Sequence, residues 1–464
     1  MRNNKGNGFD NGFDGMRATV LGLARQGTAL AKFLASRGAR VTVSDVKGMG
    51  VLQEQLTELA GWPISFILGG HPLELLDADV LFVSAGVSPD IPILMEAKRR
   101  GTRISSDTEL FFELCPATII GITGSSGKTT TTTLIGEMLQ ASGQKTWIGG
   151  NIGWSLINQV DKVSRDDLVV MELSSFQLEG LRRSPHIAVI LNITPNHLDR
   201  HNSMRRYIDA KSQVLRHQRA GDIAILGYDN ENTRRLADLT RGEVRYFSAR
   251  QPVASGAFVQ NGNLVIRQDN ETRTVCAAAD IRLPGEHNIE NVLAACATAV
   301  AAGAPLDAIR WAATSFAGVE HRLEKVRERR GIQYVNDSIA TSPERTMAAL
   351  RAFDAPIILL AGGRDKNLPM DDMARLIVER ARELILFGEA ASLIEEAVAR
   401  ARPNGSQLGI QRYLTMEEAV AAAAQTAQAG DVVLLSPSCA SFDAFQDFVE
   451  RGQRFKRIVM NLPS

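Results

Sequence analysis

Several features are scarce in this 464-residue sequence, and each scarcity excludes a class of protein. The four cysteines are scattered and form no C-x-x-C pair, which argues against a disulfide framework or a zinc ribbon and favours a reducing compartment. Basic and acidic residues both number 52, so the chain lacks the positive excess that general nucleic-acid or anionic-membrane binders need. No apolar run reaches the roughly 18 residues of a membrane span. We therefore expect a cytoplasmic globular protein that binds no nucleic acid and does not cross a membrane.

Apolar strands and helical patterns alternate along the rest of the sequence, which predicts an α/β fold. From Ala18, a strand, a glycine turn, a helix and a second strand ending at Asp45 follow in the order of a mononucleotide-binding unit. Two similar series come after it. The pattern predicts three consecutive α/β domains, over residues 16–107, 108–318 and 319–464. Residues 1–15 are rich in Asn, Gly and Asp, and we expect them to form a disordered leader.

The strongest motif is a glycine-rich loop between a strand and a helix, Gly121-Ile-Thr-Gly124-Ser-Ser-Gly127-Lys128-Thr129-Thr130. Its glycines let successive backbone N–H groups turn toward phosphate oxygens, and the helix N-terminus adds a favourable partial charge. Lys128 would reach the β- and γ-phosphates, and the Thr129 hydroxyl would bind Mg²⁺. The alternative is a plain glycine turn. The motif predicts a nucleoside triphosphate site but specifies no reaction.

Two later apolar strands run directly into polar residues, at the sheet edge where ligands collect in such folds. Glu172 ends the first of these strands. Its carboxylate would either bind a metal ion or cap a helix beginning at Ser174, and the pattern leaves both readings open. His197 follows the second strand. Lys211 lies on the next predicted helix, where spacing alone favours a solvated lysine. Three loops of the third domain share the polar-after-strand pattern and would line one cleft: 336–342, 362–366 and 436–442.

Taken together, these segments resemble the Mur ligases, the ATP-dependent amino-acid ligases of bacterial peptidoglycan precursor synthesis. The motifs that carry the resemblance lie at residues 124–129, 149–153, 172–177, 197–200, 287–288, 321–322 and 435–441. They keep the family's order along the chain. The segments at 172–177 and 436–442 favour the glutamate-adding member over its relatives.

The resemblance implies a three-domain enzyme with a division of labour between its domains. A Rossmann-like N-terminal domain would hold the UDP end of the precursor, a central phosphate-loop domain with a mostly parallel sheet would hold ATP, and a Rossmann-like C-terminal domain would bring the amino acid. The implied ATP-binding residues are Gly124, Ser125, Ser126, Gly127, Lys128, Thr129, Thr130, Asn288, Asn291, Arg322 and Asp337. The implied substrate-binding residues are Gly22, Leu23, Asp45, Lys47, Ser84, Gly86, Asn151, Thr341, Lys366, Ser441, Phe442 and Phe448.

The resemblance also implies the catalytic groups and the cofactors. The catalytic residues would be Lys128, Glu172, His197 and Lys211. The ligands of two Mg²⁺ ions would be Thr129, Glu172, His197 and Lys211, the last carrying a carbamate derived from CO₂. This modification replaces a cation by a carboxylate-like group that suits a hard metal ion. It reverses the solvated reading of Lys211 that spacing alone favours.

The implied reaction joins D-glutamate to UDP-N-acetylmuramoyl-L-alanine through an acyl phosphate. We expect a monomer that serves cell wall biogenesis, cell shape and cell division. Use of L-glutamate is an alternative, because Ile339 stands where the family often has lysine. A folylpolyglutamate synthetase-like ligase is a second, although about 105 residues of α/β pattern before the Gly124 loop count against it. A phosphate-loop nucleotide switch that only hydrolyses its nucleotide is the non-ligase alternative.

Overall fold

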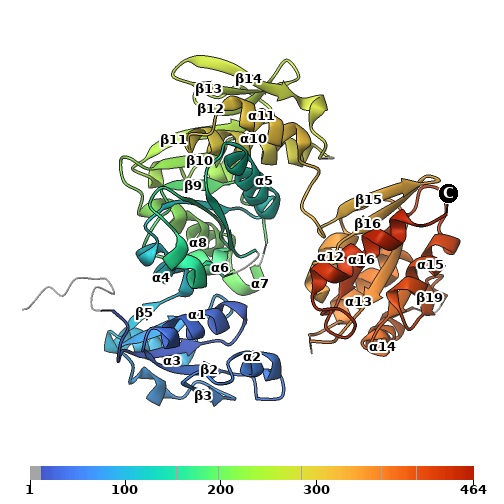
Figure 1. The fold of residues 1–464 in the computed structure, drawn as a ribbon, viewed down its shortest axis with the longest axis horizontal. Helices are drawn as coiled ribbons and strands as arrows, with labels where there is room; N and C mark the ends of the chain where they lie inside the picture. Colours follow the sequence, from blue (N-terminus) through green and yellow to red (C-terminus); the bar gives the residue numbers. More distant parts are fainter. Residues whose placement is uncertain are drawn as a thin grey trace, which may run out of the picture. The chain divides into compact units, whose positions relative to one another are not determined.

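The computed structural model describes residues 12–463, apart from 153, 154, 197, 284, 367 and 404, and the side chains of 198 and 199 are also outside the description. The chain divides into two compact units, one ending at Ala317 and one beginning at Gly318 (Figure 1). Within the described part of the chain, no helix is both long and apolar enough to cross a membrane.

The first part of the first unit is a parallel sheet in the order β3-β2-β1-β4-β5. Its strands are β1 (Arg17–Leu21), β2 (Arg40–Asp45), β3 (Ile64–Leu68), β4 (Val80–Val83) and β5 (Arg103–Ser105). Its helices are α1 (Arg25–Ser36), α2 (Gln53–Glu58) and α3 (Pro92–Arg100). Because β2 and β4 flank β1, the strand order reverses beside β1, which is where open α/β sheets bind ligands.

The second part of the first unit is a larger sheet in the order β14-β13-β12-β11-β10-β9-β6-β8-β7. Its strands are β6 (Thr118–Thr123), β7 (Thr146–Gly150), β8 (Leu168–Glu172), β9 (Ile187–Ile190), β10 (Ile223–Gly227), β11 (Glu243–Ser248), β12 (Gly256–Gln260), β13 (Asn263–Gln268) and β14 (Glu271–Ala277). The sheet is parallel except where β13 pairs with β12 and β14. The mostly parallel sheet expected for this region is confirmed.

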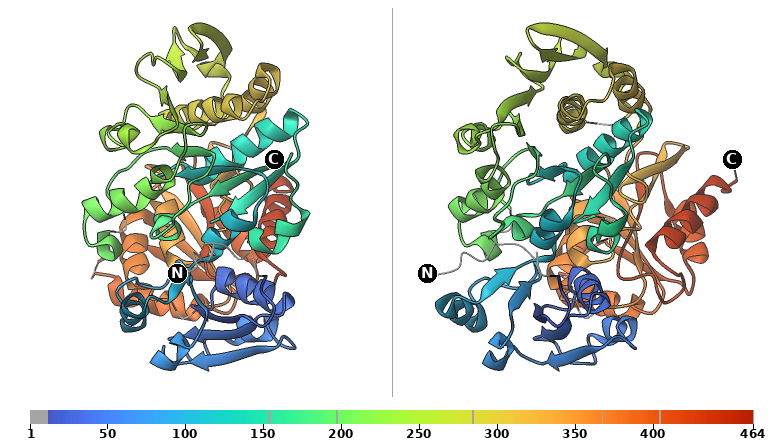
Figure 2. Two further views of the ribbon diagram at one scale, coloured as in Figure 1. Left: turned by 90° about the vertical axis from the view of Figure 1, so that its left-hand side faces the viewer. Right: turned by 60° about the vertical axis from the view of Figure 1, so that its left-hand side comes forward.

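Helices cover the larger sheet and connect its strands. They are α4 (Asp107–Leu114), α5 (Lys128–Ala141), α6 (Ser175–Leu178), α7 (Leu198–His201), α8 (Met204–Arg216), α9 (Glu231–Arg234), α10 (Glu286–Ala301) and α11 (Leu306–Ser315). Figure 2 shows the yellow-green strands β12, β13 and β14 beside the gold helices α10 and α11, and the contacts between these elements agree. Helix α10 also packs on α5, which places it next to the glycine-rich loop that opens α5.

The second unit is a sheet in the order β15-β16-β20-β17-β18-β19, antiparallel only between β15 and β16. Its strands are β15 (Glu324–Arg329), β16 (Ile332–Asn336), β17 (Ile357–Gly362), β18 (Ala381–Phe387), β19 (Gly409–Arg412) and β20 (Val432–Ser438). Its helices are α12 (Pro343–Leu350), α13 (Asp371–Arg380), α14 (Ala391–Ala401), α15 (Met416–Thr426) and α16 (Phe448–Met460).

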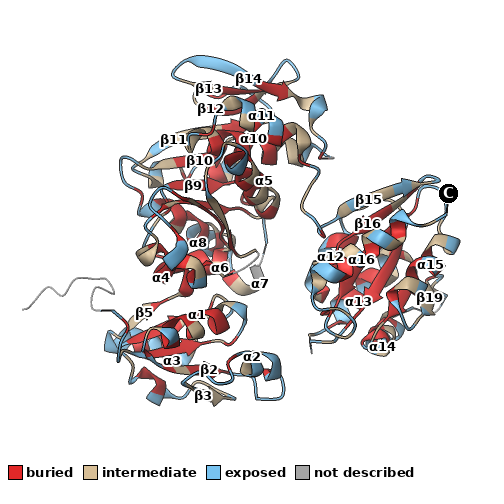
Figure 3. Cartoon of the chain, viewed as in Figure 1, coloured by how far each residue is buried: buried red, intermediate tan, exposed pale blue. Residues whose placement is uncertain are grey.

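Burial explains why the apolar runs of the sequence become central strands. Every residue of β9, β17 and β20 is buried, as expected for parallel strands that are covered on both faces. Figure 3 shows the buried residues, in red, along the strands of both units. One continuous core cluster includes apolar side chains from both sheets of the first unit.

The leader expected over residues 1–15 extends too far, and the fold begins before Met16. Phe13 is buried and meets the Phe33 ring edge-on at a centroid distance of 5.7 Å. The guanidinium of Arg37 lies over the Phe33 ring as well. Burial of one aromatic ring removes enough apolar surface from water to hold this short segment in place. Residues 1–11 lie outside the described part of the chain.

Candidate active site

The glycine-rich loop leaves the carboxyl end of β6 and turns directly into α5. Gly127 has φ of +81°, a left-handed conformation that favours glycine, and an added Cβ would collide with the carboxamide oxygen of Asn291. Helix α5 starts at Lys128, so Lys128 and Thr129 stand in its first turn. The Lys128 ammonium donates hydrogen bonds to the carbonyls of Gly124 (3.0 Å) and Ser125 (3.2 Å).

Residues that follow β9, together with Tyr207 of α8, hold this loop in shape. The hydroxyl of Ser125 donates to the Thr194 carbonyl at 2.9 Å and lies 3.0 Å from the Tyr207 hydroxyl. The side-chain oxygen of Asn192 accepts from both the backbone N–H (3.0 Å) and the hydroxyl (3.1 Å) of Ser126. These contacts fix the direction of the loop N–H groups before any anion binds.

Glu172 lies at the end of β8 and reaches the first turn of α5. Its side chain is buried; one oxygen accepts from the Thr129 hydroxyl at 2.7 Å, and the other accepts from the Asn151 side-chain amide at 2.8 Å. The helix-cap reading of Glu172 is wrong, because Ser174 itself caps α6 through a capping box with Gln177. The sequence therefore places a buried carboxylate beside the phosphate loop.

Lys211 is buried, with 1% of its surface exposed, and the solvated reading drawn from spacing is wrong. Its ammonium donates to the Thr123 hydroxyl (3.2 Å) and to the Gly124 carbonyl (2.9 Å), at the root of the phosphate loop. Burial lowers the pKa of Lys211 well below its ordinary value, and the nearby positive charge of Lys128 lowers it further. Glu172 acts in the opposite direction. The neutral amine of Lys211 is therefore favoured more than that of a solvent-exposed lysine.

The residues present suit Mg²⁺ bound together with a triphosphate. A group of three or more His, Cys, Asp or Glu side chains that could hold a metal alone is absent among the described residues. Mg²⁺ does not need such a group, because it usually takes one or two carboxylates, waters and substrate phosphates. The Thr129 hydroxyl and the Glu172 carboxylate supply two oxygen donors of this kind beside the loop. His197 lies outside the described residues.

Two predicted nucleotide residues, Asn288 and Asn291, lie on α10 next to the loop. Asn291 is buried; its oxygen accepts from the Thr131 hydroxyl at 3.4 Å, and its amide donates to Asn288 at 3.0 Å. A small cavity of about 250 Å³ opens beside the loop, between Ser126 and Asn230. Its lining is Ser126, Leu191, Asn192, Thr194, Gly227, Asp229, Asn230, Phe247, Arg250 and Glu290. Of these residues, only Ser126 was among the predicted ATP-binding residues.

The predicted precursor residues of the N-terminal sheet gather at its switch point. Asp45, at the end of β2, accepts from the backbone N–H groups of Leu23 (2.7 Å) and Lys47 (2.9 Å). Ser84, after β4, donates its hydroxyl hydrogen to the Gly22 carbonyl at 2.9 Å. The structure therefore brings these residues together on one edge of the sheet.

Two arginines connect that edge to the central sheet within the same unit. Arg25 at the start of α1 donates to the Asn151 carbonyl at 3.2 Å, and Arg200 donates to the Gly86 carbonyl at 2.9 Å. Arg25 also belongs to the glycine turn after β1 and was not predicted as a site residue. Asn151 therefore contacts both Arg25 of the N-terminal part and the Glu172 carboxylate.

In the second unit, the predicted residues cluster around the carboxyl ends of β16, β17 and β20. Lys366 donates to the Thr341 hydroxyl at 3.3 Å. Ser441 is buried, whereas Phe442 is 45% exposed. Phe448, at the start of α16, meets the His321 ring edge-on at 6.2 Å. The loops 336–342, 362–366 and 436–442 were expected to share one edge. The parallel pairing of β20 with β16 and β17 agrees with this expectation.

Asp337 and Arg451 are buried charged groups at this edge. Asp337 accepts from the Ser436 hydroxyl (2.9 Å) and from the Leu323 N–H (3.2 Å), and burial raises its pKa to about 7. Arg322 lies near enough to favour its charged form. Arg451 on α16 has no exposed surface and was not predicted as a functional residue.

Arg451 ties two of the site loops together. Its guanidinium donates to the hydroxyl and carbonyl of Ser338 (both 3.0 Å) and to the carbonyl of Cys439 (3.2 Å). It also donates to the carbonyl of Ala440 at 3.3 Å. All four of these acceptors are neutral, and burial lowers the pKa of Arg451 to about 10. The loops that carry Asp337 and Ser441 are therefore held by one side chain.

Comparison with known proteins gives the same family for each part of the chain. The Mur ligase MurD-like N-terminal domain matches residues 16–106, the Mur ligase middle domain matches 122–299, and the Mur ligase glutamate ligase domain matches 321–439. A Symbiobacterium thermophilum protein named UDP-N-acetylmuramoylalanine–D-glutamate ligase is 46% identical over 96% of this chain and 97% of its own length. A protein of the same name from Acetivibrio thermocellus is 44% identical over 99% of both chains.

Solved structures with much lower identity share the fold. The UDP-N-acetylmuramate-alanine ligase MurC from Thermotoga maritima covers 97% of this chain and 100% of its own, with a TM-score of 0.51 and 18% identity. MurF from Acinetobacter baumannii covers 95% of this chain and 93% of its own, with a TM-score of 0.50 and 16% identity. Identity above 40% over nearly the full length, with matches in all three regions, shows that the chain belongs to the Mur ligase family.

Proposed function

We propose that the protein is an ATP-dependent ligase that joins D-glutamate to UDP-N-acetylmuramoyl-L-alanine in peptidoglycan precursor synthesis. The observation that carries the proposal is the convergence of a phosphate loop, a buried carboxylate and a buried lysine at one sheet edge. A nucleotide switch needs the loop but not the other two groups. The names of relatives above 40% identity supply the substrates.

In the first step, the carboxylate of the precursor's terminal alanine attacks the γ-phosphorus of ATP, and ADP leaves. Two anions must approach each other, so the step needs positive charge at the phosphates. Lys128 supplies one such charge when it exchanges its loop carbonyl acceptors for phosphate oxygens. Mg²⁺, when bound with the triphosphate, neutralises part of the remaining phosphate charge. We propose Thr129, Glu172, His197 and Lys211 as the residues that hold two such ions.

In the second step, the amine of glutamate attacks the acyl carbon of the acyl phosphate, and inorganic phosphate leaves with the former carboxylate oxygen. We propose that the second unit binds the glutamate. The Lys366 ammonium is the cation that would pair with a glutamate carboxylate, and Thr341 already holds it in place. Ser441, Phe442 and Phe448 complete this edge, while Arg322 and Asp337 are proposed nucleotide contacts.

The environment of Lys211 supports the proposed carbamate. A neutral amine reacts with CO₂ to give an anionic carbamate and a released proton, so a lysine with a lowered pKa reacts more readily. The product is an anion beside the cation Lys128, which relieves the repulsion between the two ammonium groups. The carbamate would then join Glu172 as a second anionic oxygen donor.

Replacing Lys211 by Ala tests this role. We expect activity to fall at least 100-fold, because the site loses a charged ligand, and to recover in part when formate or acetate is added. Lys162→Ala, an exposed lysine of the same unit, is the matched control and should keep full activity. Full activity of Lys211→Ala would remove the carbamate from the account.

We further propose that the three regions 16–107, 108–318 and 319–464 act as the precursor, ATP and amino-acid domains. We also propose a monomeric enzyme of the cytoplasm that supports cell division. The described cysteines Cys115, Cys276, Cys296 and Cys439 form no disulfide, which fits a reducing compartment. Size-exclusion chromatography with light scattering tests the monomer.

The test of the reaction offers the purified protein ATP, Mg²⁺ and UDP-N-acetylmuramoyl-L-alanine with D-glutamate or L-glutamate in separate reactions. ADP release should require the precursor and D-glutamate together. Release with L-glutamate instead would change the stereochemical assignment, in which Ile339 is the residue at issue. Release with a folate acceptor would favour the folylpolyglutamate reading, and release without any acceptor would favour a nucleotide switch.

A further inference from the structure

A wide cavity opens at the edge of the central sheet opposite the phosphate loop. Its walls include the chain just before β6, β9, β10 and β11, at the amino ends of these parallel strands. The phosphate loop and Glu172 instead follow the carboxyl ends of β6 and β8. A strand of five to six residues spans roughly 17–20 Å, so the two sites lie on different edges of the sheet.

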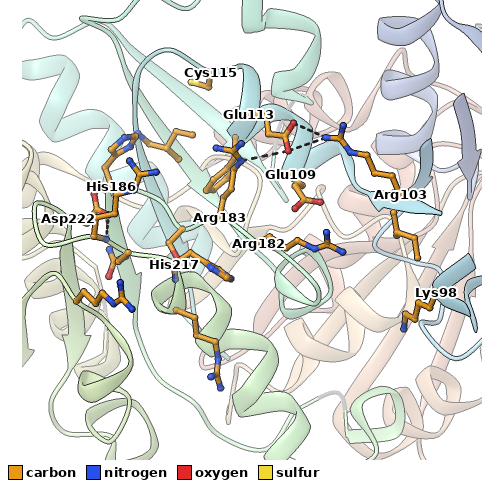
Figure 4. A pocket seen from close by; sticks show the side chains of 18 of the residues that line it. Lys98, Arg103, Glu109, Glu113, Cys115, Arg182, Arg183, His186, His217 and Asp222 are labelled. Carbon is orange, nitrogen blue, oxygen red and sulfur yellow. Dashed lines mark hydrogen bonds and ion pairs between the residues drawn. The ribbon is translucent and has the colours of Figure 1, made fainter. Parts of the chain in front are cut away.

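The cavity, called here the basic cavity, has a volume of about 1190 Å³. Its charged lining consists of Lys98, Arg103, Glu109, Glu113, Arg182, Arg183, Arg216, Arg219, Asp222 and Arg241. Seven cations face three carboxyl groups, although the whole chain carries a formal net charge of zero. Figure 4 shows Lys98 and Arg103 on one side, His186, His217 and Asp222 on the other, and Arg182 and Arg183 between them.

The acidic groups of the cavity do not balance this charge. Glu113 pairs with Arg103 at 3.2 Å and with Arg183 at 3.8 Å, so one carboxylate serves two guanidinium groups. Asp222 accepts from the backbone N–H of Arg219 at 2.6 Å. Arg216 pairs with Asp209, outside the cavity lining, at 2.6 Å. Within the described residues, no carboxylate lies within 4.0 Å of the guanidinium groups of Arg182, Arg219 or Arg241.

Gathering like charges in a concavity destabilises the fold unless something offsets it, and a bound polyanion does so with charge-assisted hydrogen bonds. His186 adds a ring N–H donor to the lining. His186 accepts from the Ile119 N–H through Nδ1 at 3.0 Å, so Nε2 is the ring nitrogen that carries a proton and can donate. The volume exceeds the roughly 300–1,000 Å³ of common small-molecule sites, which is ample for a nucleotide-sized ligand.

We propose that the basic cavity binds a small molecule carrying a di- or triphosphate group, at a non-catalytic site separate from the ATP loop. Its walls come from both parts of the first unit. Lys98 (α3) and Arg103 (β5) belong to the N-terminal part, and Arg182 and Arg241 precede β9 and β11 of the central sheet. A bound polyphosphate would therefore bridge the two sheets. The shared chemistry is the phosphate chain, whether it comes from inorganic polyphosphate or from a nucleotide.

Calorimetric titration of the full-length protein with inorganic tripolyphosphate tests the proposal. The wild type should bind two equivalents, one at the ATP loop and one in the basic cavity. Lys128→Ala should lose the first, and the double variant R182A/R241A should lose the second or bind it at least tenfold more weakly. The control R165A/R273A removes two exposed arginines elsewhere in the unit and should keep both equivalents.

Two results would overturn the proposal. One is a single equivalent in the wild type that disappears with Lys128→Ala. The other is equal weakening by R182A/R241A and R165A/R273A, which would indicate only general charge. A parallel titration of the Lys128→Ala protein with GTP distinguishes the sources. Tighter binding of GTP than of tripolyphosphate supports a nucleotide ligand, and equal binding supports recognition of the phosphate chain alone.

Discussion

Substituting Asn for Asp337 should make the second unit more stable at neutral pH. The Asp337 side chain is 5% exposed, and burial raises its pKa from 3.8 to about 7. Near pH 8 the carboxyl is ionised in both the folded and the unfolded chain, and the folded state pays for burying the charge. A pKa difference of about three units corresponds to at most about 4 kcal/mol. We therefore expect Asp337→Asn to raise the free energy of unfolding of the second unit by roughly 2–4 kcal/mol.

The dependence on pH has a definite sign. Below pH 4 the carboxyl is protonated in both states, and the substitution changes little. Between pH 4 and 7 the unfolded chain loses the proton first, so the wild type loses stability as the pH rises. The advantage of Asp337→Asn should grow through this window and stay constant above it. The Ser436 hydroxyl can then donate to Thr346, which lies 3.1 Å away, and accept from the new amide.

The assay must report on the second unit alone. All four tryptophans (Trp62, Trp147, Trp154 and Trp311) belong to the first unit, so tryptophan fluorescence serves as an internal control that should not change. Hydrogen exchange of peptides from β16 and β20 at pH 4.5, 6 and 8 measures the opening free energy of the second unit. Ser436→Ala removes a hydrogen bond to the ionised form, so its stability should fall more steeply with pH. A stability difference between Asp337→Asn and wild type that stays constant from pH 4.5 to 8 would refute the reasoning.

Two further substitutions test the loops of the site. Gly127→Ala should weaken ATP binding at least tenfold in a direct titration. The left-handed backbone costs a residue with a Cβ about 1–2 kcal/mol, and the new atom would collide with Asn291. Unchanged affinity would show that ATP binding does not need this loop conformation. Arg451→Met should destabilise the second unit by about 3 kcal/mol or more in the same exchange assay, because it leaves buried carbonyls of Ser338 and Cys439 without donors. The control is Arg454→Met on the exposed face of α16. Equal destabilisation by the two substitutions would contradict the role of Arg451.

The fold was largely predictable because its strands are apolar and its turns are marked by glycine. Strands such as β9 and β17 contain no polar side chain that would interrupt the apolar pattern, and the phosphate loop follows a strand in the expected order. The edge of the central sheet was harder to predict. Strands β12, β13 and β14 form an antiparallel extension. Polar and charged residues in β13 and β14 interrupt the apolar pattern that marks the other strands.

The burial of Lys211 could have been predicted from a signal that was not used. The buried residues Tyr207, Ala210, Val214 and Leu215 recur on one face of α8, and Lys211 falls in the same stripe. Arg451 similarly lies between Phe448 and Phe455 along the inner face of α16. A cation inside an apolar helical stripe is costly to bury, so it indicates a specific partner or a catalytic use.

Other parts of the site could not be read from the sequence. Glu172 was ambiguous because a carboxylate before a helix serves equally well as a cap, and only the position of Thr129 and Asn151 resolves the choice. The basic cavity could not be predicted from the sequence either, because its residues are far apart along the chain. Its arginines come from separate elements and connecting segments, and no local pattern brings Arg182 and Arg241 together.

The most direct measurement of the central claim follows the oxygen atoms of the precursor. The carboxylate of UDP-N-acetylmuramoyl-L-alanine is labelled with ¹⁸O and incubated with the protein, Mg²⁺, ATP and D-glutamate, and the released phosphate is analysed by mass spectrometry. An acyl phosphate requires one labelled oxygen to move from the precursor into each phosphate. Phosphate that carries no label would contradict the account, because ATP would then have been cleaved by water instead of by the substrate carboxylate.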